Sequence, residues 1–166
     1  MVKNEMYYFH QTPENLAIDL INKIRTYIND DDLLFEPFKG EGSFYNNFPI
    51  NNPKIYTEIE EDLDYTTINH NVDWVISNPP FKIDGKNKFY ELILHFINIA
   101  QKGIIFLCND YCVMSLTPKR IKEINNRGFF ITKMIVCNVK KWRGRYYFIV
   151  FTKNNNNFIS YLDNNY

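Results

Sequence analysis

The sequence lacks the features that define several common protein classes. No apolar run approaches the roughly 20 residues of a membrane span, and no apolar signal segment follows the N-terminal residues. The chain has only three cysteines, Cys108, Cys112 and Cys137, an odd number that fits no paired zinc-binding spacing. We therefore expect a cytoplasmic protein without membrane contact, with reduced structural cysteines and no bound metal.

No internal repeat, linker or long low-complexity segment divides the chain. Apolar residues make up 45% of the sequence and charged residues 23%, which excludes a disordered chain, a collagen and a coiled coil. A chain of 166 residues can bury roughly 70% of its unfolded surface and needs no disulfide to fold. We expect residues 1–166 to form a single domain.

Acidic residues are scarce in one part of the chain. Residues 111–153 carry ten basic side chains and one acidic side chain, whereas residues 1–80 carry five basic and fourteen acidic ones. This separation indicates that one end of the protein meets a polyanion and the other does not. The alternative is that both sets of charges only solvate helix faces.

Hydrophobic periodicity and turn residues predict alternating strands and helices. We expect helices at residues 13–28, 88–101 and 118–127, the first capped by Thr12. We expect strands at residues 33–35, 54–57, 72–77, 104–108, 129–139 and 146–153. The last two strands lie too close in sequence for a parallel crossover, so they must be antiparallel. The predicted fold is α/β, a doubly wound and mostly parallel sheet with a C-terminal antiparallel hairpin strand.

A glycine-containing segment, residues 36–44, follows the first of these strands. Its glycines let the backbone turn tightly and approach a ligand. The segment begins with an acid, Glu36, and a second acid, Glu58, ends the next strand. An acid at the end of that strand typically accepts hydrogen bonds from ribose hydroxyls. The segment lacks a third glycine and a following Lys-Ser/Thr, so a nucleoside ligand without phosphates fits better than a dinucleotide or triphosphate. A capping acid beside a tight turn is the alternative.

A second segment, Asn78-Pro79-Pro80-Phe81, ends the third strand. Two consecutive prolines cannot continue a ladder and they fix φ, so Asn78 sits on a rigid elbow. The Asn78 side-chain oxygen and the Pro79 carbonyl can each accept one amino hydrogen, and Phe81 offers a flat face for stacking. The segment suits a planar group that bears an amino group. A simple strand-ending turn is the alternative.

Together these segments resemble the S-adenosylmethionine-dependent N6-adenine DNA methyltransferases, over residues 7 to about 152. The motif order is the one called gamma, and the resemblance implies a Rossmann-like class I methyltransferase fold. It implies catalytic roles for Asn78, Pro79, Pro80 and Phe81. It implies S-adenosylmethionine contacts for Tyr8, Thr12, Glu36, Pro37, Phe38, Gly40, Gly42, Phe44, Glu58, Ile59, Asp64, Tyr65 and Asn78.

Cations and aromatic residues alternate in the predicted hairpin turn and are available to meet phosphates and bases. The nucleic-acid-binding residues we expect are Lys119, Arg120, Lys140, Lys141, Trp142, Arg143 and Arg145. The alternative is that Trp142 and Tyr147 pack into the sheet and the cations only solubilise the turn.

We expect the chain to lack the target-recognition domain that similar enzymes acting alone usually carry. Sequence specificity must then come from short loops, from a partner subunit or a homodimer, or be low. We expect DNA as the substrate, with RNA adenine or a protein glutamine as alternatives. A further alternative is a catalytically silent methyltransferase-like subunit that binds a partner.

Overall fold

The computed structural model describes residues 7–8, 11–140 and 142–153. Tyr8 is described by its backbone alone, and Lys141 lies outside the described residues. Within the described part of the chain, no helix is long and apolar enough to cross a membrane.

A six-stranded sheet forms the centre of the structure, in the order β3-β2-β4-β6-β8-β7. Its strands are β2 (Leu34–Glu36), β3 (Lys54–Tyr56), β4 (Val72–Ser77), β6 (Ala100–Asn109), β7 (Phe130–Cys137) and β8 (Tyr146–Thr152). Strand β2 pairs in parallel with β3 and β4, and β4 pairs in parallel with β6. Strand β8 runs antiparallel to both β6 and β7. The predicted mixed sheet with a C-terminal antiparallel pair is confirmed.

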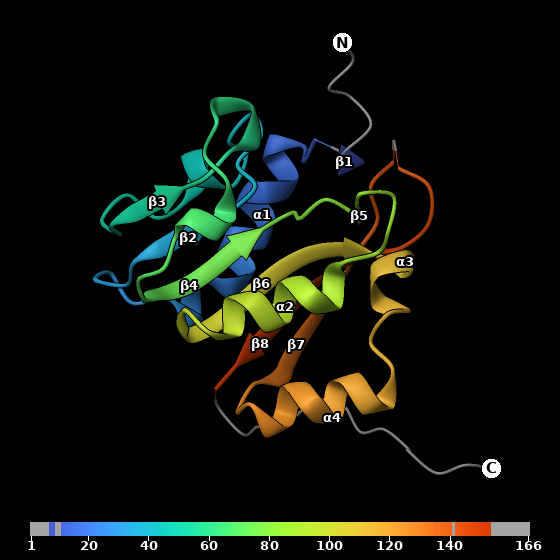
Figure 1. Cartoon of the computed structure of the whole chain (residues 1–166). Coiled ribbons are helices and arrows are strands. Elements are labelled where there is room, and N and C mark those ends of the chain that lie inside the picture. Colours follow the sequence, from blue (N-terminus) through green and yellow to red (C-terminus); the bar gives the residue numbers. More distant parts are fainter. Residues whose placement is uncertain (1–6, 9–10, 141, 154–166) are drawn as a thin grey trace, which may run out of the picture.

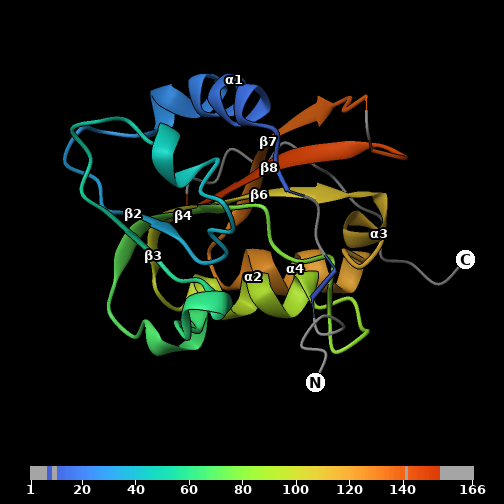
Figure 2. The same ribbon diagram turned by 90° about the horizontal axis from the view of Figure 1, so that it is seen from above.

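Helices cover both faces of this sheet, so the fold is doubly wound as predicted (Figures 1 and 2). Helix α1 (Glu14–Ile24) lies on one face, and α2 (Phe89–Ile97) and α4 (Pro118–Asn126) lie on the other. The short helix α3 (Asp110–Val113) follows the carboxyl end of β6. Single 3-10 turns complete the set: η1 (Arg25–Tyr27), η2 (Tyr45–Asn47), η3 (Ile59–Glu61) and η4 (Tyr65–Thr67).

The predicted boundary between the helix at residues 88–101 and the strand at residues 104–108, with Gly103 as the helix stop, is wrong. Helix α2 ends at Ile97 and β6 begins at Ala100, so Gly103 lies inside a strand and does not end a helix. A Cβ built on Gly103 would stand 2.3 Å from the Trp74 ring and 2.5 Å from the Phe151 carbonyl oxygen. Glycine is present there because the neighbouring strands leave no space for a side chain.

The predicted cap of the first helix is also wrong. Pro13 occupies the N-cap position of α1, and no side chain caps the helix. The Thr12 hydroxyl instead accepts a hydrogen bond from the Asn78 side chain.

A second, two-stranded ribbon was not predicted. Strand β1 (Tyr7–Tyr8) pairs antiparallel with β5 (Lys82–Ile83), which follows Phe81 directly. The ribbon brings the N-terminal segment to the carboxyl edge of the sheet (Figure 1).

The core is largely aromatic and aliphatic, with one buried polar cluster at the amino ends of the strands. The Trp74 indole donates to Asp32 Oδ2 at 2.8 Å, and Lys102 pairs with the other carboxylate oxygen of Asp32.

All three cysteines are free and buried. Burial raises the pKa of Cys112 to about 12, so this thiol is not a nucleophile at neutral pH.

Candidate functional site

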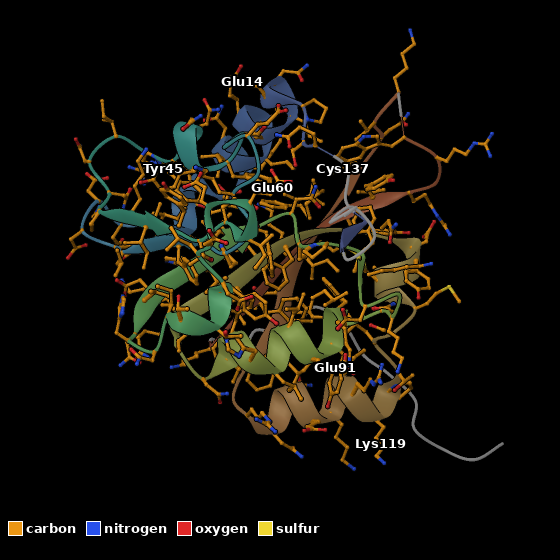
Figure 3. All side chains as sticks on the ribbon, turned by 45° about the horizontal axis from the view of Figure 1, so that its top comes forward. Glu14, Tyr45, Glu60, Glu91, Lys119 and Cys137 are labelled. Atoms are coloured by element: carbon orange, nitrogen blue, oxygen red, sulfur yellow. The ribbon has the colours of Figure 1, made fainter. Side chains whose placement is uncertain are left out.

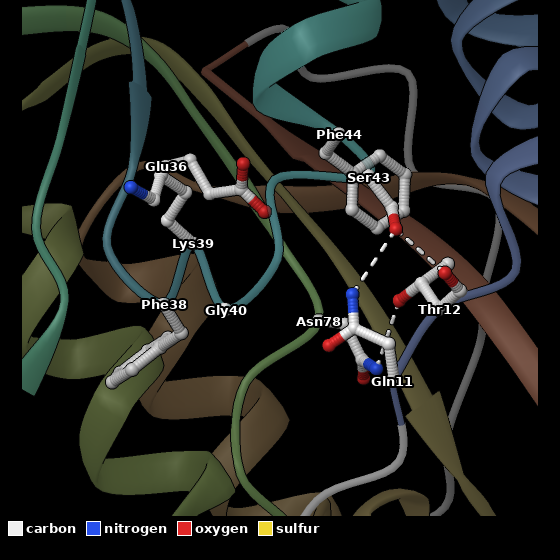
Figure 4. Close-up of a pocket in the computed structure, with 9 residues that line it drawn as sticks. All are labelled: Gln11, Thr12, Glu36, Phe38, Lys39, Gly40, Ser43, Phe44 and Asn78. Carbon is white, nitrogen blue, oxygen red and sulfur yellow. Dashed lines mark hydrogen bonds between the residues drawn. The ribbon is translucent and has the colours of Figure 1, made fainter. Parts of the chain in front are cut away.

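The two segments singled out in the sequence meet at one edge of the sheet. Parallel pairing of β2 with β4 brings the end of β2, at Glu36, beside the residue after β4, Asn78. Both residues line the same pocket (Figure 4). The residues that line this pocket are Gln11, Thr12, Glu36, Phe38, Lys39, Gly40, Ser43, Phe44 and Asn78.

The glycine loop between Glu36 and η2 forms one wall of the pocket. Gly40 and Gly42 have φ values of +52° and +87°, a region that disfavours other residues. A Cβ at Gly42 would also stand 2.9 Å from the Asn46 side-chain nitrogen. Glu58 Oε2 accepts a hydrogen bond from the Gly40 N–H at 2.5 Å. The acid predicted to meet a ribose therefore also fixes the backbone of the glycine loop.

Glu36 is a buried carboxyl at the base of the pocket. It is 2% exposed, and its Oε2 accepts a hydrogen bond from the Tyr45 N–H at 2.6 Å. Burial raises the pKa of Glu36 well above its usual value, and the nearby Glu58 charge acts in the same direction. The Tyr45 hydrogen bond and the Lys39 charge oppose this shift of the pKa. The free protein therefore holds the Glu36 proton to unusually high pH.

Asn78 is held by the segment that precedes α1. Its Nδ2 donates to the Thr12 hydroxyl at 3.1 Å (Figure 4). The Ser43 hydroxyl donates to the Thr12 carbonyl at 2.6 Å, and the Gln11 side chain donates to Ser43 at 3.2 Å. Residues 11–12 thus connect the Asn78 elbow to the glycine loop.

The aromatic residue of the elbow is buried against the C-terminal strand pair. Phe81 is 2% exposed, and its ring centroid lies 6.1 Å from that of Tyr146. Tyr146 in turn lies 4.6 Å from the ring of Trp142, which is half-buried. These rings form a series from the elbow to the β7–β8 connection, which we define as residues 138–145. Pro79 and Pro80 are also buried.

The remaining residues expected to contact the cofactor lie around the glycine loop and beyond β3. The Phe38 and Tyr65 rings pack 5.1 Å apart, and Ile59 is 43% exposed. Asp64 Oδ1 accepts hydrogen bonds from the Thr66 N–H and hydroxyl.

Two other members of the set have structural contacts. Phe44 stacks on Phe148 in the core at 5.6 Å. The Pro37 carbonyl accepts a hydrogen bond from the Thr57 hydroxyl at 2.8 Å.

The structure separates the predicted nucleic-acid-binding residues into two groups. Lys140, Arg143 and Arg145 are exposed on the β7–β8 connection, at the pocket end of the sheet. Lys119 and Arg120 lie on α4, away from the pocket (Figure 1). Arg120 donates to the Ser115 carbonyl at 2.9 Å and lies 4.5 Å from the Tyr90 ring centre, so intramolecular contacts engage its guanidinium.

Sequence reasoning missed three residues that line the pocket. Lys39 and Ser43 lie inside the recognised glycine segment, and their place beside glycines could have singled them out. Gln11 has no local signal, because it reaches the pocket only through its contact with Ser43.

The sequence matches no protein-family model and no curated protein. Solved structures do match the fold. A protein from Pyrococcus horikoshii proposed to be an RNA methyltransferase shares 19% identity over 89% of this chain and 87% of its own, with a TM-score of 0.66. Magnesium protoporphyrin IX methyltransferase from Synechocystis, solved with bound S-adenosylmethionine, shares 12% identity over 85% of this chain and 79% of its own, with a TM-score of 0.63.

A third match is the modification subunit of a proposed type I restriction enzyme from Vibrio vulnificus. It shares 10% identity over 91% of this chain, with a TM-score of 0.61. This chain spans 46% of that subunit. Similarity at these identities concerns the fold, and the strand order and pairing described above agree with it. The chain adopts the Rossmann-like α/β fold of the class I methyltransferases.

Proposed function

We propose that this protein transfers a methyl group from S-adenosylmethionine to the exocyclic N6 of adenine in DNA. The observation that carries the proposal is the meeting of Asn78 with Glu36 and the glycine loop in one pocket. The Asn78 amide, which can accept a hydrogen bond from an amine, then lies beside the glycine loop and Glu36, which suit a nucleoside ligand. The match to a restriction-modification subunit favours DNA.

The polar and apolar groups around the pocket fit S-adenosylmethionine. The buried Glu36 carboxyl suits the cationic methionine amino group, and Glu58 suits the ribose hydroxyls. Exposed Ile59 and the ring of Tyr65 suit the adenine face. When bound, this cofactor supplies an electrophilic methyl group on a positively charged sulfur.

The contribution of the chain itself is to orient the target amine. The lone pair of the adenine amino group is delocalised into the ring, which makes this group a poor nucleophile. Hydrogen bonds from the amine to the Asn78 side-chain oxygen and the Pro79 carbonyl localise the lone pair and direct it toward the methyl group. Such positioning supplies much of the rate. A target base in a duplex must first leave the stack.

The contacts of Asn78 support this role. A carboxamide can present either its oxygen or its nitrogen to a ligand, and only the oxygen accepts a hydrogen bond. In the structure, the nitrogen is directed to the Thr12 hydroxyl. In this orientation the nitrogen is used within the protein, which is the arrangement that the proposed role of the oxygen requires.

RNA adenine is the second candidate substrate, favoured by the match to the Pyrococcus horikoshii protein. Either substrate would bind over the exposed cations Lys140 and Arg143. The short loops at this edge, or a partner subunit or second copy of the chain, would supply target recognition.

The test is methyl transfer from labelled S-adenosylmethionine to unmethylated duplex DNA, with RNA of the same sequence in parallel. We expect label in DNA, recovered as N6-methyladenine. Label in RNA alone would show that RNA adenine, and not DNA adenine, is the substrate. Bound cofactor with no label in either nucleic acid would contradict the proposal and favour a protein substrate or a silent subunit.

We also expect the affinity for S-adenosylmethionine to increase with pH. Burial raises the pKa of Glu36 in the free protein, so this carboxyl keeps its proton to higher pH than an exposed glutamate does. A cationic group bound beside Glu36 favours the carboxylate, so binding releases a proton. The increase covers the interval between the pKa of Glu36 in the complex and its raised pKa in the free protein. Dissociation constants for S-adenosylmethionine, measured over a pH series, give the slope of affinity against pH.

The Glu36→Gln variant is the control, because it keeps the shape of the side chain and cannot ionise. Its cofactor affinity should be lower and nearly independent of pH in the same interval. An equal pH slope in the variant and the unchanged protein would assign the slope to another group.

A further inference from the structure

Three lysines outside the predicted nucleic-acid set lie directly after the catalytic elbow. Residues 82–88, which we call the 82–88 loop, contain Lys82, Lys86, Lys88 and a single acid, Asp84. Lys82 lies in β5, and a bridge between Ile83 and Lys86 closes the loop into a tight turn. The side chains of Lys82 and Lys86 are exposed. The loop therefore places positive charge a few residues beyond Asn78, which lines the pocket.

An exposed aromatic ring lies beside these lysines. Tyr111 on α3 is 41% exposed, and the Lys82 ammonium lies 5.5 Å from the centre of its ring. The Asn87 side chain donates to the Tyr111 carbonyl at 2.6 Å and ties α3 to the 82–88 loop. A ring fixed at its backbone and flanked by a cation is a typical platform for stacking a nucleic-acid base.

Helix α3 also connects this loop to the β7–β8 connection. Asp110 Oδ1 accepts a hydrogen bond from the Tyr147 hydroxyl at 2.8 Å and pairs with Arg145 at 3.3 Å. The Asp110 charge is therefore balanced by Arg145. Figures 1 and 2 show α3 at the carboxyl end of the sheet, between the 82–88 loop and the β7–β8 connection.

The basic helix α4 differs in both position and contacts. It lies beyond α2 from the pocket, and Lys119 points away from the rest of the molecule (Figure 3). Arg127 pairs with Glu123 at 3.1 Å, and Arg120 is held by Ser115 and Tyr90. The excess of basic residues in the C-terminal half of the sequence thus gives no single surface.

We propose that the 82–88 loop and α3 form a nucleic-acid-binding surface, with Lys82 and Lys86 on backbone phosphates and Tyr111 stacked on a base. This inference rests on the proposed function, since it names the surface that delivers the substrate strand to Asn78. It also transfers the phosphate-binding role predicted for α4 to a different element.

The test compares two variants of equal charge change. The first, Lys82→Glu with Lys86→Glu, reverses the proposed surface, and the control, Lys122→Glu with Lys153→Glu, reverses exposed lysines elsewhere. Binding of a short fluorescein-labelled single-stranded DNA is followed by anisotropy over a salt series. Each lost phosphate contact lowers the salt slope by about 0.7, so the first variant should lose roughly 1.4 and bind roughly ten-fold more weakly. The control should stay close to the unchanged protein.

Equal losses in both variants would overturn the proposed surface while leaving the proposed function intact, because net charge alone would explain them. A loss confined to the control would have the same meaning. If the unchanged protein binds neither DNA nor RNA, the nucleic-acid substrate itself fails, and the surface with it.

Two substitutions at Tyr111 separate stacking from charge. Tyr111→Ala should weaken binding about five-fold or more without changing the salt slope, since base stacking on an aromatic ring is lost. Tyr111→Phe keeps the ring and should retain the affinity. Unchanged binding in the alanine variant would remove Tyr111 from the surface.

Discussion

Replacing Asn78 by alanine is expected to abolish methyl transfer and to leave S-adenosylmethionine binding largely in place. The substitution removes one of the two acceptors proposed to orient the target amine, and the loss of a single preorganised polar group of this kind costs roughly 100-fold or more in rate. It also removes the hydrogen bond to Thr12. Single-turnover methyl transfer and cofactor binding, measured on the same preparation, give the two quantities.

Ser77→Ala is the matched control. Ser77 precedes Asn78 at the end of β4, is fully buried, and its hydroxyl has no hydrogen-bond partner among the described residues. Removal of this hydroxyl is expected to be neutral or slightly stabilising. Turnover should therefore survive in Ser77→Ala and disappear in Asn78→Ala. Turnover retained in Asn78→Ala would remove this residue from the mechanism.

The second large effect concerns stability. Gly103→Ala should lower the free energy of unfolding by about 3 kcal/mol or more, at the upper end for overpacked cores. The new methyl group would meet the Trp74 ring at 2.3 Å and the Phe151 carbonyl at 2.5 Å. A rotation of Trp74 cannot relieve the second contact, because it involves the backbone of a paired strand. Denaturant unfolding followed by circular dichroism measures the change.

Gly128→Ala provides the comparison. Gly128 follows α4 with a φ of +83°, and no atom lies within 4 Å of a Cβ built there. Its substitution carries only the cost of the left-handed conformation, about 1–2 kcal/mol. If Gly103→Ala is no less stable than Gly128→Ala, the crowding between β4, β6 and β8 is not real.

The sheet could be predicted because its strands carry local signals. Apolar runs with turn residues at their ends mark β4 and β8, and the short spacing before β8 requires an antiparallel pair. The pocket could be predicted for a related reason. Glu36 and Asn78 both follow predicted parallel strands, whose carboxyl ends share one edge of the sheet.

The contacts that complete the site could not be predicted, because they join residues distant in sequence. Thr12 has the pattern of a helix cap, yet its hydroxyl meets Asn78, 66 positions later. Strands β1 and β5 have two residues each, too few to show any periodicity. Gly103 has the local pattern of a helix stop, and only the packing of Trp74 reveals its actual role.

The ring series from Phe81 through Tyr146 to Trp142 has a spectroscopic consequence. The chain contains two tryptophans. Trp74 is 3% exposed in the core and bonded to Asp32, whereas Trp142 is half-buried at the solvent end of the series. Their fluorescence therefore originates from two different environments. Emission from Trp74 should change when the core unfolds, and emission from Trp142 should change when a ligand binds at the Asn78 elbow. No attached dye is needed to follow either process.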